Sequence, residues 1–238
     1  MPSARWMRPD LIIRPTTDEL AAAGHLLSQL PNVPLTVNEY IALRRPAQDR
    51  HWAHMRALPG AERLVAHLAA HGIPLAIATG STRLNYARKT AHLQHVFQHF
   101  RGNIVCMDDD NGAHRGKPFP DLFLAAARGL GRNVGVEEGK GEGGKDGSGA
   151  GSLMEVECAE RARGLVFEDS VTGVQAGKRA GMSVVWIPDE RFFGVSGGAE
   201  AEQQPDQILR SLEEFVPEEW GLPPFDYSVA KIQSCVEK

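Results

Sequence analysis

The chain has few of the residues that mark several common protein classes. Its three cysteines (Cys106, Cys158 and Cys235) lie far apart and are odd in number, so we expect no disulfide framework and a reducing, cytoplasmic location. No apolar run approaches the roughly 18 residues of a membrane-spanning helix, and the N-terminus lacks the apolar core of a secretory signal. The net charge of −4 argues against general nucleic-acid binding. Neither a membrane nor a nucleic acid is therefore an expected partner.

Glycine is distributed unevenly along the chain. Of the 25 glycines, nine lie among the 21 positions from Gly131 to Gly151. The segment is charged and has no apolar periodicity, so it buries too little surface to offset the entropy lost on ordering. We therefore expect a flexible glycine-rich insertion at 131–163. A phosphate-binding glycine loop is not favoured, because no strand leads into the segment and the GxxxxGK[ST] run is missing.

From residue 60 onward, apolar segments of helix length and strand length alternate. Such alternation predicts an α/β fold in which a doubly wound parallel sheet has helices on both faces. Residues 1–58 are less regular, with possible helices over Thr16–Leu30 and Val37–Leu43. The expected strands are Ile73–Ala78, Ile104–Cys106, Leu165–Phe167 and Ser183–Ile187, and the expected helices are Ala61–Ala70, Ser81–His95, Pro118–Leu130 and Val171–Ala180.

Polar residues that suit a phosphate group lie in the loops after two of the expected strands. Thr79, Gly80 and Ser81 end the run IPLAIATGS, where a hydroxyl and loop N–H groups can bind phosphate oxygens; a helix cap explains the same residues. Lys117 precedes Pro118 at the start of a helix, and a lysine fixed there can neutralise a phosphoryl group. Taken alone, Lys117 is better explained as a surface lysine before a helix-starting proline.

Two adjacent carboxylates, Glu168 and Asp169, close the buried strand that begins at Leu165. Ligands of open α/β sheets bind at the carboxyl ends of the strands, and carboxylate oxygens suit Mg²⁺. These two residues are therefore candidate metal ligands. An acidic cap on the following helix is the alternative interpretation.

In this order, the three features resemble the haloacid dehalogenase-like hydrolase superfamily. Thr79 matches its second motif, Lys117 in GKPFPDLF its third, and Glu168-Asp169 in VFEDSVTGVQAGKRAGM its fourth. The residues of the third and fourth motifs are similar to those of phosphatases and phosphomutases with a helical cap, such as pseudouridine-5′-phosphatase-like and beta-phosphoglucomutase-like proteins. The resemblance covers about residues 58–225.

The resemblance implies a Mg²⁺-dependent phosphatase that hydrolyses a small phosphorylated metabolite through an aspartyl-phosphate. Thr79, with Gly80 and Ser81, would bind the phosphoryl oxygens, and Lys117 would pair with the phosphate and the nucleophile. Asp169 would ligate Mg²⁺, with Glu168 nearby. By the same resemblance, residues 1–58 would form part of a helical cap, 59–225 the core and 226–238 a C-terminal tail.

The first motif of the family, an Asp-x-Asp at the end of the central strand, is missing upstream of Thr79. Asp10, Asp18 and Asp49 have no partner two positions away, and the run 108–110 follows the second motif, where a polar loop is expected. Leu11–Arg14 could supply a degenerate first strand, but without a carboxylate nucleophile. We therefore expect an inactive pseudoenzyme, a binding or regulatory protein, or a truncated gene product. A missing central strand would leave its two neighbours with unpaired edges.

Histidine and cysteine offer weaker alternatives. All nine histidines lie between His25 and His114, and His92, His95 and His99 share helical spacing. A solvated helix face explains them better than a zinc site, which needs three or four converging ligands. The cysteines form no CxxC pair, and a nucleophilic cysteine is not favoured.

Overall fold

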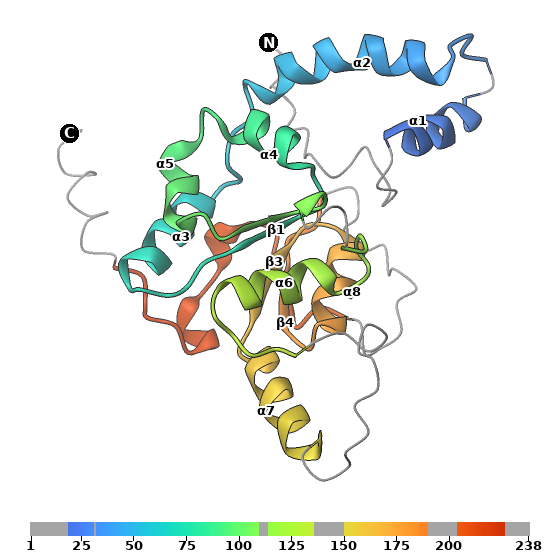
Figure 1. The fold of residues 1–238 in the computed structure, drawn as a ribbon. Helices are drawn as coiled ribbons and strands as arrows, with labels where there is room; N and C mark the ends of the chain where they lie inside the picture. The colour runs from blue at the N-terminus through green and yellow to red at the C-terminus, as the bar shows by residue number, and fades with distance from the viewer. Residues whose placement is uncertain (1–18, 31, 110–113, 136–149, 190–203, 227–238) are drawn as a thin grey trace, which may run out of the picture.

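The structure is a computed structural model that describes residues 19–30, 32–109, 114–135, 150–189 and 204–226 (Figure 1). Helices and parallel strands alternate through most of this range, which confirms the α/β class predicted from the sequence. The helices are α1 (Glu19–Ser28), α2 (Val37–Trp52), α3 (Ala61–Ala70), α4 (Arg83–Thr90), α5 (Gln94–Phe97), α6 (Asp121–Gly129), α7 (Ala150–Ala162) and α8 (Val171–Arg179). The strands are β1 (Ile77–Thr79), β2 (Ile104–Cys106), β3 (Leu165–Glu168), β4 (Ser183–Trp186) and β5 (Gln207–Ile208), and short 3-10 helices cover Gln98–Phe100, Leu212–Glu214 and Pro217–Trp220.

The described strands form two separate parallel sheets. In the smaller sheet β1 pairs with β2, with Ile77 opposite Ile104. In the larger sheet the order is β3-β4-β5, with Leu165 opposite Ser183. Within the described residues, four strands each therefore have one edge without a ladder partner: β1, β2, β3 and β5.

Apolar layers cover both faces of the larger sheet. On one face, Val166 and Val184 pack with Phe123 and Leu124 of α6 and with α8, and Ala78 of β1 lies at the margin of this cluster. On the other face, Val185 and Phe167 pack with α3, with Phe215 and with the segment near Phe225. Adjacent strand residues point to opposite faces, which explains why Val184 and Val185 enter different clusters.

Several predicted boundaries differ from the structure. The apolar run Ile73–Ala78 contributes only its end to β1, which begins at Ile77. The single helix expected over Ser81–His95 is divided into α4 and α5 by a turn around Leu93, whose N–H bonds to the carbonyl of Thr90. The possible helix at Val37–Leu43 begins where predicted, after a capping box of Thr36 and Glu39, but it continues to Trp52.

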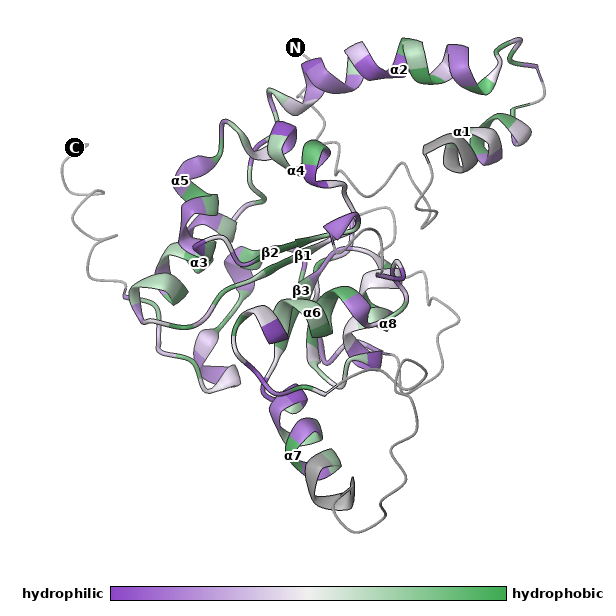
Figure 2. Ribbon diagram, in the orientation of Figure 1, coloured by the Kyte–Doolittle hydropathy of each residue, from purple (hydrophilic) through white to green (hydrophobic). Residues whose placement is uncertain are grey.

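The prediction of irregular structure throughout 131–163 is wrong for Ala150–Ala162, which forms α7. The glycine-rich part of this segment ends at Gly151, and the residues that follow within the helix are mostly helix formers such as Leu, Met, Glu and Ala. The range 136–149 lies outside the described residues. Figure 1 shows α7 and the α1–α2 pair at opposite ends of the molecule, away from the strands, and Figure 2 shows α2 as mostly hydrophilic.

Among the helices in the described ranges, none is both long and apolar enough to cross a membrane. The cytoplasmic location expected from the sequence stays a prediction.

Candidate functional site

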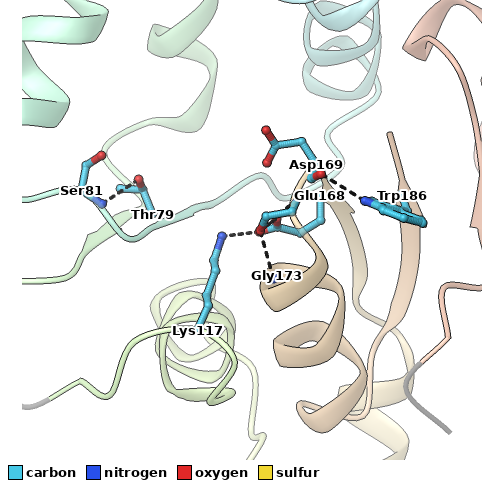
Figure 3. Close-up of polar contacts among 8 residues, drawn as sticks. Thr79, Ser81, Lys117, Glu168, Asp169, Gly173 and Trp186 are labelled. Atoms are coloured by element: carbon cyan, nitrogen blue, oxygen red, sulfur yellow. Dashed lines mark hydrogen bonds and ion pairs between the residues drawn. The ribbon is translucent and has the colours of Figure 1, made fainter. Parts of the chain in front are cut away.

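The loop after β1 brings hydroxyl and amide groups to the carboxyl end of the smaller sheet. The Ser81 N–H donates to Thr79 Oγ1 at 3.1 Å, so residues 79–81 form a tight turn (Figure 3). Gly80 has open space where a Cβ would stand, which leaves its backbone approachable. The helix cap that was the alternative explanation belongs to Thr82, whose hydroxyl accepts from the Asn85 N–H at 3.3 Å. Thr79, Gly80 and Ser81 thus lie before the cap.

Aspartates after β2 hold this loop in place. Asp108 Oδ1 accepts from the Arg83 N–H at 2.7 Å, and Asp109 accepts from the Arg83 guanidinium and from the Cys106 N–H. Burial opposes the charged form of Asp109, but these hydrogen bonds outweigh burial and lower the pKa of its carboxyl below its usual range. Two residues of the run 108–110 therefore connect loops, as the polar-loop interpretation predicts. Asp110 lies outside the described residues.

Cys106 lies in the same corner of the molecule and is buried. Burial raises the pKa of its thiol to about 11, with the negative charges of Asp109 and Asp108 opposing the effect of Arg83. A thiol that stays protonated at neutral pH is a poor nucleophile.

Lys117 and Glu168 form a buried ion pair between the two sheets. The Lys117 ammonium contacts Glu168 Oε1, and the two side chains are 13% and 6% exposed. The ammonium also lies 5.2 Å from the centroid of the Phe123 ring, which packs against it from α6. Figure 3 shows Lys117 pointing from its own loop toward the end of β3. The interpretation of Lys117 as a surface lysine is therefore wrong: the short loop before α6 directs it inward.

The start of α8 fixes the other oxygen of Glu168. The Ser170 hydroxyl donates to Glu168 Oε2 at 3.1 Å and accepts from the Gly173 N–H at 3.0 Å, which makes Ser170 the cap of α8. A Cβ at Gly173 would collide with the Glu168 carboxylate. Gly173 is absent from the predicted site residues, although a glycine in the first turn of a helix indicates a close approach.

Asp169 takes a different direction from Glu168. Its backbone carbonyl accepts from Trp186 Nε1 at 3.1 Å, and in Figure 3 its carboxylate points away from Lys117. Within the described ranges, no group of three or more His, Cys, Asp or Glu side chains comes together as a metal site. Because Glu168 is already engaged by Lys117 and Ser170, the described residues do not by themselves fit Mg²⁺, which prefers six well-placed oxygens.

Figure 3 shows Thr79 and Ser81 on one side of a small region and Lys117, Glu168 and Asp169 on the other. Hydroxyl groups, loop N–H groups and a buried ammonium are donors of the kind that bind oxyanions.

Sequence comparisons connect this arrangement to known proteins. A family model described as haloacid dehalogenase-like hydrolase matches residues 38–181. An uncharacterised protein of Schizosaccharomyces pombe is 34% identical over 198 residues, which cover 82% of this chain and 73% of that protein. The (DL)-glycerol-3-phosphatase 2 of Arabidopsis thaliana is 36% identical over 82% of this chain and 68% of its own length. A probable pseudouridine-5′-phosphatase of Drosophila melanogaster is 35% identical over 81% of this chain and 70% of its own.

Solved structures share the fold at low sequence identity. A hydrolase of the same family from Entamoeba histolytica superimposes with a TM-score of 0.55 at 19% identity, over 82% of this chain and 75% of that one. A family hydrolase from Deinococcus radiodurans, solved with bound phosphate and sodium, gives a TM-score of 0.54 at 21% identity, over 88% and 92%. At these identities the likeness concerns the fold alone.

Proposed function

Because the chain belongs to the haloacid dehalogenase-like hydrolase family, we propose that it forms the phosphate-binding part of a phosphatase site for a small phosphate monoester. We further propose that these 238 residues by themselves bind such an ester without hydrolysing it. The ion pair of Lys117 and Glu168 carries the proposal, since it positions an ammonium group at the carboxyl ends of the strands, where a phosphate would bind.

Binding would use donors from both sheets. An ammonium has three N–H donors, so Lys117 can keep Glu168 and still donate to a phosphate oxygen. Thr79 and Ser81 would donate from their hydroxyls, and the approachable backbone at Gly80 would supply an N–H. Burial of Lys117 strengthens its attraction for a phosphate, because the surrounding dielectric is lower than that of water.

The names of the relatives support a small phosphorylated metabolite as the ligand. Those names specify glycerol 3-phosphate and pseudouridine 5′-phosphate as substrates of the relatives. Either ester presents one phosphate on a small polar body. We propose this class of ligand for the chain, without choosing between the two.

Hydrolysis would need a carboxylate nucleophile that the chain does not supply upstream of Thr79. The lack of an Asp-x-Asp upstream of Thr79 favours the second candidate function, a binding or regulatory protein that keeps part of a phosphate site. We propose Mg²⁺ binding only if further carboxylates join Asp169 and Glu168. The described residues alone do not form a group that could hold the ion.

The binding half is tested by calorimetric titration with glycerol 3-phosphate. Lys117→Ala would leave Glu168 buried without its cation, so the double variant Lys117→Ala/Glu168→Gln is used to preserve the fold. We expect the double variant to bind at least about tenfold more weakly than the native chain. Arg128→Gln is the control, since Arg128 donates to the carbonyl of Gly135 at 2.9 Å and lies outside the site. Equal affinity of native and double variant would overturn the binding proposal.

The catalytic half is tested by phosphate release from the same ester in the presence of Mg²⁺. We expect the native chain to release no more phosphate than the double variant does. Release by the native chain that disappears in the double variant would overturn the proposal that the chain does not hydrolyse its ligand.

A further inference from the structure

Lys89 contacts the loop at Thr79–Ser81, although it lies outside the three sequence motifs. It lies in the last turn of α4, and helical side chains lean toward the N-terminus of their helix. Its stem therefore runs back along α4 to the loop from which the helix starts, and its Nζ donates to Ser81 Oγ at 2.8 Å. Ser81 is separated from Lys89 by eight positions but touches it through this bond.

The same ammonium contacts the end of α2. Lys89 Nζ lies 5.3 Å from the centroid of the Trp52 ring, and Trp52 is the last residue of α2 and is buried. A cation over an aromatic face is attracted by the ring quadrupole. Lys89 therefore joins two parts of the molecule, the α1–α2 pair and the loop at Thr79–Ser81.

The bond to Lys89 determines what the Ser81 hydroxyl can do. A hydroxyl has one proton to donate and two lone pairs. Because the ammonium has no lone pair, Ser81 Oγ must accept from it, and the hydroxyl proton then points elsewhere. The Ser81 N–H already donates to Thr79 Oγ1, so this proton is the group that Ser81 can offer to a bound anion.

We propose that Lys89 is a positioning residue for the bound phosphate: it orients the Ser81 hydroxyl as a donor to a phosphate oxygen, and through Trp52 it couples that binding to the end of α2. The proposal rests on the proposed phosphate site and assigns to it a residue outside the three motifs.

A double-mutant cycle in calorimetric titrations with inorganic phosphate tests this inference. Lys89→Met keeps the length and apolar contacts of the stem and removes the charge. We expect about tenfold weaker binding for Lys89→Met, a similar loss for Ser81→Ala, and almost no further loss when both are combined. Lys89→Arg should recover part of the affinity. Arg88→Met is the matched control and should bind like the native chain, since Arg88 pairs with Asp49 at 3.5 Å outside the loop.

Trp52 fluorescence gives a second readout that a merely structural role would not change. Phosphate should alter the fluorescence of the native chain by an amount that is lost in both Lys89→Met and Trp52→Phe, while the far-ultraviolet circular dichroism of each variant stays native. Full additivity of Lys89→Met and Ser81→Ala, or unchanged affinity in Lys89→Met, would overturn the inference while leaving the phosphate site intact. Absence of phosphate binding by the native chain would instead refute the proposed function, and the inference with it.

Discussion

The two sheets are held together by different forces. The larger sheet has apolar layers on both faces, and Val184 and Val185 are fully buried between them. The strand residues of β1 are only half-buried, and side chains of Arg83, Asp108 and Asp109 connect the loops at its end. The comparison teaches that, within the described residues, the smaller sheet depends more on polar contacts in its loops, and less on burial of its strand residues, than the larger sheet does.

The largest expected effect comes from removing an aromatic ring from the core of the larger sheet. Phe215 is 1% exposed and packs edge-on against Phe167, with ring centroids 5.0 Å apart. Phe215→Ala should lower the free energy of unfolding by about 4 kcal/mol, because it removes buried contacts and leaves a cavity. Urea denaturation measures the change. Ile208→Ala is the control at an exposed site of β5 and should cost less than about 0.5 kcal/mol; a similar loss in both variants would contradict the assignment of this core.

The second test breaks the ion pair that lies between the sheets. Lys117→Met leaves the Glu168 carboxylate buried without its cation and should destabilise the chain by about 3 kcal/mol. Adding Glu168→Gln should recover at least half of this loss, since the uncompensated charge is then gone. Thermal unfolding of the native chain and the three variants gives the coupling between the two residues. Strict additivity would mean that the two side chains do not interact.

The third test concerns the smaller sheet and is sensitive to pH. Asp109→Asn should cost about 1–2 kcal/mol at pH 7, because it removes a charged acceptor from Arg83 and Cys106. The folded state lowers the pKa of Asp109, so this stabilisation is present above the ordinary value of about 3.9 and is lost as the pH falls through the folded value. Urea denaturation from pH 7 to pH 3 should show the two chains converging below about pH 4. A difference that does not shrink as the pH falls would assign the effect to shape rather than to charge.

The smallest test compares the helix caps that follow β1 and β3. Ser170 caps α8 through the Gly173 N–H, and Ser170→Ala should cost about 1 kcal/mol. Thr82 caps α4, but Asp108 also accepts from the first N–H of that helix, so Thr82→Ala should cost less than Ser170→Ala. Thermal unfolding of the two variants measures both. An equal or larger loss in Thr82→Ala would show that Asp108 does not share the cap.

The helices and strands from residue 60 onward were largely predictable, because amphipathic periodicity and apolar runs depend on local sequence. The proximity of Lys117 and Glu168 followed from motif order and is present in the structure. The inward direction of Lys117 was not predictable from local sequence, because it depends on packing against Phe123 of α6. Lys89 escaped prediction for a related reason: its contacts to Ser81 and Trp52 join three segments, and no motif spans them.

The register of the two sheets also bears on how the chain folds. Ile77 pairs with Ile104, Leu165 with Ser183 and Val185 with Gln207, so each ladder joins residues fewer than thirty positions apart. Loops of this length close with a modest entropy cost, and neither sheet has to wait for a strand from the other. We therefore expect the ladders of the two sheets to form independently, with the Lys117–Glu168 pair joining the sheets afterwards.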